Sequence, residues 1–203
     1  MAPTAIALNC SLKRSGGEPS STDKLLGQVI AALKAEGVET IETIRVADHD
    51  VKPGVSSDEG DGDAWPGLRE RILSADILIF GGPIWLGQPS SIAKRVLERM
   101  DAFLGEADEQ GRTPAYGKVA VAAIVGNEDG AHHVSAELFQ ALNDVGFTIP
   151  AAAAAYWTGE AMHKTDYKDL DHTPEPTAQA TKMLARNAAH LARLLAGSCY
   201  PGM

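Results

Sequence analysis

The sequence predicts a doubly wound α/β fold, in which helices cover both faces of one open parallel sheet. Five short apolar segments alternate along the chain with segments whose apolar residues recur at helical spacing. The runs at 76–80 (DILIF) and 118–125 (KVAVAAIV) have the length and composition of buried strands. Parallel strands need crossover connections, and right-handed crossovers place the connecting helices on both faces of the sheet.

The first half of the chain is expected to contribute three strands and two helices. Residues 4–9 form a short apolar run that ends at a polar loop, as a buried strand does. Apolar residues then recur at helical spacing from Leu25 to Leu33, and Gly37 ends that helix. After it come an alternating strand at 38–46, an acidic loop at 47–66, a short helix at 68–73 and the strand at 76–80.

The second half continues the same alternation. A tight loop at 81–88 leads to Pro89, which is placed to start a helix. The apolar stripe of that helix consists of Ile92, Val96, Leu97, Met100, Phe103 and Leu104. The elements that follow are a strand at 118–125, a loop at 126–130, a helix at 134–145, a fifth strand at 147–155 that contains Pro150, a polar insertion at 156–176 and a last helix at 177–195.

Composition limits the class of protein and its partners. The 203 residues are 44% apolar and 22% charged, which fits one globular domain over 1–203 that carries the insertion. The net charge of −9 argues against nucleic acid or an anionic membrane surface as a partner, because both require clustered Lys and Arg. No apolar run is long enough for a bilayer, and the N-terminus lacks the pattern of a signal peptide. Since Cys10 and Cys199 make no disulfide framework, a cytoplasmic protein is expected.

Three chemically unusual loops follow the first, third and fourth strands. In an open doubly wound sheet, ligands bind outside the carboxyl ends of the strands, where the strand order reverses. The three loops are therefore expected to converge on one edge of the sheet and to form a ligand site there.

The loop after the first strand is rich in hydroxyl groups and ends where a helix begins. Its polar groups come from Ser11, Lys13, Ser20, Ser21 and Thr22. The unpaired N–H groups and partial positive charge of a helix N-terminus bind phosphate readily. The alternative is ordinary helix capping, because Ser20 and the acid three residues later form a capping-box-like pair.

Spacing excludes other phosphate-binding loops. The Gly-x-x-x-x-Gly-Lys-Ser/Thr pattern of P-loop NTPases does not occur, and no Gly-x-Gly-x-x-Gly follows the first strand. Cys10 stands where small tyrosine phosphatases carry their nucleophile, but Gly16 occupies the position where their motif requires Arg. Cys10 is therefore expected to be a small buried residue.

The loop after the third strand suits a flat aromatic ligand. The segment Pro83-Ile84-Trp85-Leu86-Gly87 combines a rigid backbone with large apolar side chains at the end of a strand. Ile84 or Trp85 would cover one face of the ligand while backbone groups reach its polar edge. The alternative is a buried Trp85 that only packs the loop onto the sheet.

The remaining polar clusters indicate no catalytic or metal site. Neighbouring side chains on a helix diverge by about 100°, so His132 and His133 chelate a metal poorly, and one of them is expected to face a pocket. The acidic loop at 48–63 lacks the spacing of an EF-hand and is expected to be a solvated surface. His163 and His172 are expected on the surface, and no Gly-x-Ser-x-Gly nucleophile motif follows any strand.

Taken together, the three loops resemble those of the flavodoxin-like NAD(P)H-dependent FMN reductases and quinone reductases. The sequence Ser11-Leu12-Lys13-Arg14, with Ser21-Thr22 after it, is similar to the phosphate loop of that family. The segment 83–87 is similar to its isoalloxazine loop, and the loop at 126–130 occupies the place of its third flavin loop. The chain departs from the family pattern at Cys10, Leu12 and Ser21, where Gly, Pro and Asn are usual.

The resemblance implies a five-stranded sheet in the order 2-1-3-4-5 and an FMN cofactor that carries the redox chemistry, so no catalytic side chain is expected. NAD(P)H would be the reductant, and a quinone, a flavin or a similar planar small molecule the acceptor. The implied cofactor-binding residues are Ser11, Lys13, Ser20, Ser21, Thr22, Pro83, Ile84, Trp85, Leu86, Gly87, Gly126, Asn127, Asp129 and Gly130, and His132 and Trp157 are expected to line the substrate pocket.

The resemblance also implies a homodimer or a higher homo-oligomer. The apolar residues Met100, Phe103, Leu104 and Tyr116 give a further hint of a surface for this assembly. Two alternatives to a reductase remain open. One is an electron carrier of flavodoxin type without steady-state reductase activity. The other is a flavin-free binding domain, because a fold does not imply a function.

Overall fold

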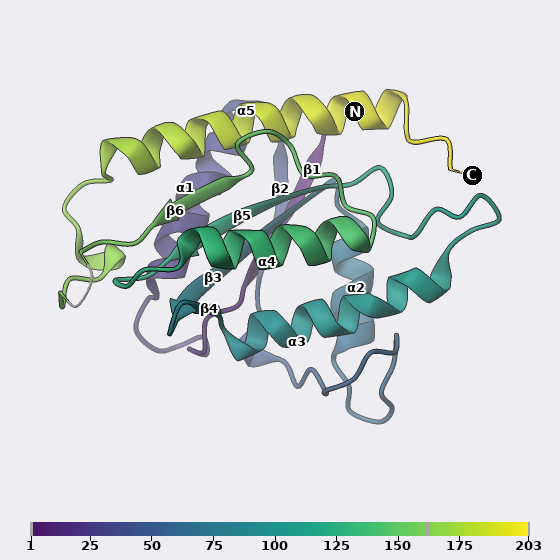
Figure 1. Cartoon of the computed structure of the whole chain (residues 1–203), viewed down its shortest axis with the longest axis horizontal. Helices are drawn as coiled ribbons and strands as arrows, with labels where there is room; N and C mark the ends of the chain where they lie inside the picture. The colour runs from purple at the N-terminus through teal and green to yellow at the C-terminus, as the bar shows by residue number, and fades with distance from the viewer. Residues whose placement is uncertain (1, 161–162, 203) are drawn as a thin grey trace.

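The computed structural model describes residues 2–160 and 163–202 and shows an open sheet between two layers of helices (Figure 1). Its parallel strands lie in the order β2-β1-β3-β5-β6. They are β1 (Thr4–Asn9), β2 (Glu39–Arg45), β3 (Ile77–Trp85), β5 (Val119–Val125) and β6 (Ala154–Trp157), and β4 (Gln88–Pro89) pairs antiparallel with β3. The predicted flavodoxin-like order is confirmed, and the strand order reverses between β1 and β3.

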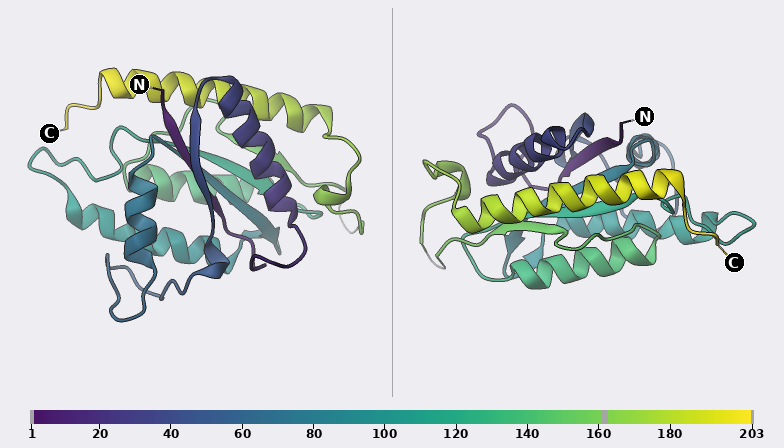
Figure 2. Two further views of the ribbon diagram at one scale, coloured as in Figure 1. Left: turned by 180° about the vertical axis from the view of Figure 1, so that it is seen from behind. Right: turned by 90° about the horizontal axis from the view of Figure 1, so that it is seen from above.

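Helices cover both faces of the sheet, as predicted. On one face, α1 (Ser21–Ala35) and α5 (Glu175–Gly197) bury an apolar cluster with the central strands. On the other face lie α2 (Trp65–Leu73), α3 (Ser91–Met100) and α4 (Ala131–Asp144). Figure 2 shows α4 and the α1–α5 layer on opposite sides of the sheet. Because β5 is covered on both sides, each of its residues is buried, which explains its continuous apolar sequence.

The third strand is longer than predicted. The segment 81–85, predicted as part of a loop, continues β3, because β4 folds back and pairs with Ile84 and Trp85. The chain turns between them through Leu86 and Gly87, which both have positive φ values of 52° and 73°. Ile84 and Trp85 therefore stand on a rigid hairpin at the carboxyl edge of the sheet.

The fifth parallel strand begins later than predicted. Thr148 forms only an isolated bridge with Val119, and continuous pairing starts at Ala154. Pro150 lies between these points and has no N–H for the ladder. Tyr156 and Trp157 consequently belong to β6, and the insertion starts after them.

The acidic loop is a solvated surface at Asp50, Asp58 and Asp61, as predicted, but that prediction is wrong for Asp63. Asp63, near its end, forms an ion pair with Arg99 of α3 in which the N–O distance is 2.7 Å and neither side chain is exposed. Arg99 also donates to the backbone carbonyls of Lys52 and Ser56, so it closes the loop from inside. Burial raises the pKa of Asp63, but hydrogen bonds from backbone N–H groups and Arg99 outweigh it and lower the pKa to about 2.

Two of the four residues that hinted at assembly lie in the core. Met100 and Phe103 are fully buried, so the expectation that they form a surface between copies is wrong for these two residues. Leu104 is half exposed and lies with Phe103 in a 3₁₀ helix (Asp101–Glu106) beyond the end of α3. None of the helices in the described part of the chain combines the length and apolarity needed to cross a bilayer.

Candidate functional site

The loops that follow β1, β3 and β5 meet at the carboxyl edge of the sheet. They enclose a cavity of about 150 Å³ at the switch point between β1 and β3. The residues that line it are Ser11, Leu12, Lys13, Ser20, Ser21, Thr22, Pro83, Ile84, Trp85, Val125, Gly126, Asn127, Trp157, Asp166, Tyr167 and Lys168. Eleven of these sixteen residues, Trp157 among them, were predicted from the sequence.

Ser20 closes the polar end of this cavity as a helix cap. Its hydroxyl accepts a hydrogen bond from the backbone N–H of Asp23, and the Asp23 carboxylate accepts one from the backbone N–H of Ser20. This is the capping box that was the alternative interpretation. Since the Ser20 hydroxyl also donates to Asp23, its single proton is already used.

Three other hydroxyl groups keep a proton to donate. The Ser11 hydroxyl accepts a hydrogen bond from Arg45, and the Ser21 hydroxyl accepts one from the backbone N–H of Lys168. Thr22 is 1% exposed and also lines the cavity. With the ammonium of Lys13 and the first N–H groups of α1, these hydroxyls form an anion-binding end.

The other end of the cavity is apolar and rigid. Pro83, Ile84 and Trp85 reach it from the hairpin of β3 and β4. Gly126 lets the loop after β5 approach closely, because a Cβ there would lie 2.9 Å from the Cβ of Ile84. Trp85 is 53% exposed, so the alternative in which it only packs onto the sheet is wrong.

Four of the predicted cofactor residues do not line the cavity. Leu86 is 91% exposed, and its N–H and that of Gly87 donate to the carboxylate of Glu128. Gly130 lies directly against Gly87, since a Cβ on it would be 2.7 Å from the Gly87 Cα. Asp129 accepts a hydrogen bond from the N–H of Gly130. These contacts join the turn between β3 and β4 to the loop after β5, and thereby hold the wall of the cavity in place.

The insertion supplies three lining residues that sequence reasoning missed: Asp166, Tyr167 and Lys168. Tyr167 is buried, and its hydroxyl donates to Gln28 of α1 over 2.5 Å. Lys24 of α1 donates to the carbonyl of Leu170 over 2.7 Å and lies 5.4 Å above the Tyr167 ring. The available signal was an aromatic and a leucine within an otherwise polar stretch, which indicates a segment that docks.

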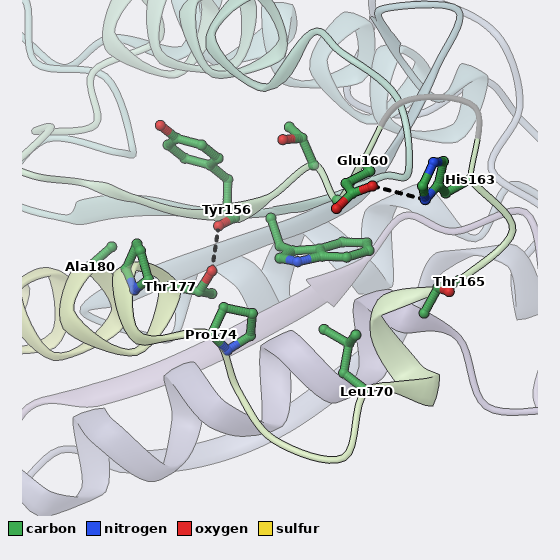
Figure 3. Close-up of a pocket in the computed structure, with 12 residues that line it drawn as sticks. Tyr156, Glu160, His163, Thr165, Leu170, Pro174, Thr177 and Ala180 are labelled. Carbon is green, nitrogen blue, oxygen red and sulfur yellow. Dashed lines mark hydrogen bonds and ion pairs between the residues drawn. The ribbon is translucent and has the colours of Figure 1, made fainter.

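A second, larger cavity of about 550 Å³ lies beside the first, and Trp157 lines both. Figure 3 shows this second cavity with the residues that line it. Its walls come from the end of β6, the insertion and the first turn of α5. Leu170, Pro174 and Ala180 make one side apolar, and Glu160 pairs with His163 at a distance of 3.0 Å. His163 is exposed, as predicted, but it also lines this cavity.

His132, a predicted pocket wall, is not among the residues that line either cavity. Its Nε2 lies 2.9 Å from the hydroxyl of Tyr156, and the two rings pack edge to face. His133 pairs with Glu137 on the same helix. Within residues 2–160 and 163–202, no group of three or more His, Cys, Asp or Glu side chains is arranged to hold a metal ion.

Cys10 is buried directly beneath the site. Burial raises the pKa of its thiol, so the sulfur stays protonated and is a poor nucleophile. This matches the prediction that Cys10 is a small structural residue.

The cavity fits the two chemistries that FMN combines. Its polar end offers the hydroxyls of Ser11, Ser21 and Thr22 and a cation to a phosphate, and its other end offers flat apolar surfaces to a ring. Fold and site thus define a doubly wound α/β protein with a nucleotide-type cavity at the switch point of its sheet.

The chain belongs to the NADPH-dependent FMN reductase family. The sequence model of the family described as "NADPH-dependent FMN reductase" matches residues 3–161. This places the chain in the family that its three loops resemble.

Relatives of this chain carry different names. It is 35% identical to the 8-demethyl-8-aminoriboflavin-5'-phosphate synthase of Streptomyces davaonensis, over 98% of its own length and 81% of the synthase. It is 38% identical over 94% of its length to a Mycobacterium bovis protein named "Divalent metal cation transporter MntH", of which it spans only 29%. Its structure is similar to the crystal structure of RosB with the bound intermediate 8-demethyl-8-formylriboflavin-5'-phosphate, with a TM-score of 0.87 and 34% sequence identity. The similarity covers 98% of this chain and 82% of the RosB chain.

Proposed function

We propose that this protein is an FMN-dependent oxidoreductase that passes reducing equivalents from NADPH or NADH to a planar acceptor such as a quinone or a free flavin. The observation that carries the proposal is the two-ended cavity at the switch point. Membership of the reductase family supports both the cofactor and the reductant.

The chain's own residues would bind and orient the cofactor rather than react. Ser11, Ser21 and Thr22 would donate hydrogen bonds to its phosphate, and Lys13 would balance the charge. Ile84 and Trp85 would exclude water from one face of its ring system. When bound, FMN would supply the hydride-transfer chemistry, so no nucleophilic side chain is needed.

The larger cavity is the proposed acceptor site. Trp157 stands between it and the cofactor cavity, and an aromatic wall favours a flat acceptor by stacking. Leu170 and Pro174 extend the apolar surface, whereas Glu160 and His163 offer polar contacts at the opening.

A flavin titration followed by steady-state kinetics tests the proposal. FMN should bind more tightly than FAD, because the hydroxyl-rich loop suits a terminal phosphate and no pyrophosphate fingerprint is present. The FMN-loaded protein should then oxidise NADPH or NADH with a quinone or free flavin as acceptor. Tighter binding of FAD would contradict the cofactor assignment. A flavin reduced by dithionite but by neither nicotinamide would favour the electron carrier, and a colourless protein that takes up no FMN would favour the flavin-free domain.

A second candidate is an enzyme that modifies the flavin itself. The Streptomyces synthase is named for a riboflavin-5'-phosphate derivative, and the RosB structure holds another such derivative as a bound intermediate. The similarity to each covers nearly all of this chain. A riboflavin-5'-phosphate substrate would use the same phosphate-binding end. Mass spectrometry of the flavin after many turnovers separates the two candidates, because a reductase returns FMN unchanged.

We also propose a homo-oligomer, with a dimer as its smallest form. Leu12, Trp85 and Leu86 are large apolar side chains that stay exposed around the mouth of the site, where a second copy would cover them. Light scattering at micromolar concentration tests this, and a particle mass of 21.4 kDa would contradict it.

A further inference from the structure

We infer that Arg45 is a positioning residue that makes the loop after β1 selective for a terminal phosphate, so that its removal reduces the preference for FMN over riboflavin. The inference rests on the proposed function, because it takes FMN as the ligand. Arg45 itself is not among the residues that line the cavity, and it acts through groups that do.

Arg45 connects the edge of the sheet to the phosphate loop. It is the last residue of β2, and its side chain is 16% exposed. One guanidinium nitrogen donates to the hydroxyl of Ser11 over 3.2 Å and to the carbonyl of Lys13 over 3.1 Å. The other lies 2.5 Å from both carboxylate oxygens of Asp23. A single side chain thus fixes both ends of the loop.

The first consequence concerns the direction of the Ser11 hydroxyl proton. A guanidinium has donors and no acceptor, so the Ser11 oxygen must accept from Arg45. The hydroxyl proton is then left for a different acceptor. Because Ser11 lines the cavity and is 3% exposed, a phosphate oxygen there would receive that proton.

The second consequence concerns the charge of Asp23. This carboxylate lies in the first turn of α1, where a phosphate would bind, and it would repel an anion if it were unpaired. Burial raises the pKa of Asp23, but hydrogen bonds from Arg45 and Ser20 outweigh it and lower the pKa, so the group stays ionised. Arg45 neutralises this charge, and the Asn9 amide donates to the same carboxylate over 2.6 Å.

Both effects act on the phosphate and not on the ring. Riboflavin has the same ring system as FMN but lacks the phosphate, so it reports on the apolar end alone. A merely structural Arg45 would affect both ligands equally.

The test compares binding of FMN and riboflavin by fluorescence quenching in the wild type, Arg45→Ala, Arg45→Lys, Asp23→Asn and the Arg45→Ala/Asp23→Asn double variant. Arg45→Ala should weaken FMN binding about 10- to 100-fold, because the Ser11 proton is no longer directed to the phosphate and the Asp23 charge is left unpaired beside it. Riboflavin binding should change less than about 2-fold. Arg45→Lys keeps the charge without the forked geometry and should fall in between. The double variant should bind FMN more tightly than Arg45→Ala, because the unpaired carboxylate is gone. Circular dichroism establishes that each variant is folded.

Equal weakening of FMN and riboflavin in Arg45→Ala, or unchanged FMN binding, would overturn the inference while leaving the proposed function intact. If Arg45→Ala does not fold, Arg45→Lys still decides, since the inference requires that the ratio of the FMN and riboflavin affinities change in this variant. A wild-type protein that binds neither flavin would overturn the proposed function, and the inference with it.

Discussion

Two polar segments outside the sheet, the acidic loop at 48–63 and the insertion that follows β6, have similar compositions and opposite roles. The acidic loop folds around Arg99 of α3. Its Asp63 forms an ion pair with Arg99, and neither of the two side chains is exposed. The insertion docks on α1 through Lys24 and Tyr167 and lines the cavity. The helix that a segment contacts therefore decides its role. The acidic loop, on α3, stabilises the fold, whereas the insertion, on α1, forms part of the cavity wall.

Removal of Arg99 should give the largest effect on stability. Arg99→Ala leaves the Asp63 carboxylate buried without its cation, which typically costs about 3–5 kcal/mol. Urea denaturation measures the loss. FMN affinity below the unfolding transition should stay unchanged, since no residue of this pair lines the cavity. The variant Arg99→Met/Asp63→Leu is the matched control and should lose less, because no charge is left unpaired.

Acid should reproduce part of that loss. The pKa of Asp63 is about 2 in the folded protein, below the usual value near 4 that it takes when unfolded. Its contribution is therefore complete above about pH 4 and disappears as the pH falls toward about 2. Thermal unfolding between pH 6 and pH 2.5 measures this. The difference in Tm between the wild type and Asp63→Asn should shrink as the pH falls, and a constant difference would contradict the assignment.

Within the phosphate loop, the hydroxyls should separate into binding and capping groups. Ser11→Ala and Thr22→Ala should each weaken FMN binding by roughly 1.5–3 kcal/mol, because each removes a donor to a charged acceptor. Ser20→Ala should instead lower stability by about 1 kcal/mol through loss of the helix cap, with little change in FMN affinity. Fluorescence titration and urea denaturation of all three variants measure the two effects. The reverse pattern would show that Ser20 is the binding group.

Trp157 should give the smallest effect and should locate the acceptor. Trp157→Ala removes the wall shared by both cavities, so the KM for a planar acceptor should rise by the equivalent of roughly 0.5–1.5 kcal/mol. FMN affinity should change less. Trp157→Phe is the control and should keep most of the stacking. Steady-state kinetics with a quinone measures the KM, and a larger effect on FMN than on the acceptor would move the acceptor site elsewhere.

Much of the candidate site was predictable because its chemistry lies in contiguous loops. Ser11 and Thr22 follow β1, and Ile84 lies at the carboxyl end of β3. Since the carboxyl ends of these parallel strands share one edge, the convergence of the three residues follows from topology. Leu86 and Gly130 were assigned to the cofactor because they lie in the same loops, yet they join the loops to each other. Sequence alone does not give the direction of each side chain at a turn.

The residues that were missed act across long separations. Arg45 reaches Ser11 from 34 positions away, and Lys24 reaches Leu170 from 146 positions away. No local periodicity or motif encodes such a contact, because in the sequence Arg45 and Lys24 each have the appearance of an ordinary surface cation.

The sequence by itself determined the order of strands and helices along the chain, the parallel sheet and the edge of the sheet at which the three unusual loops meet. These follow from local apolar patterns and from the handedness of crossovers, which act within neighbouring segments. The tertiary structure alone decided that the insertion forms part of the cavity, that Asp63 is buried with Arg99 and that Arg45 bonds to both Ser11 and Asp23. Those contacts depend on which surfaces meet after the helices have packed, and burial then turns ordinary polar side chains into partners.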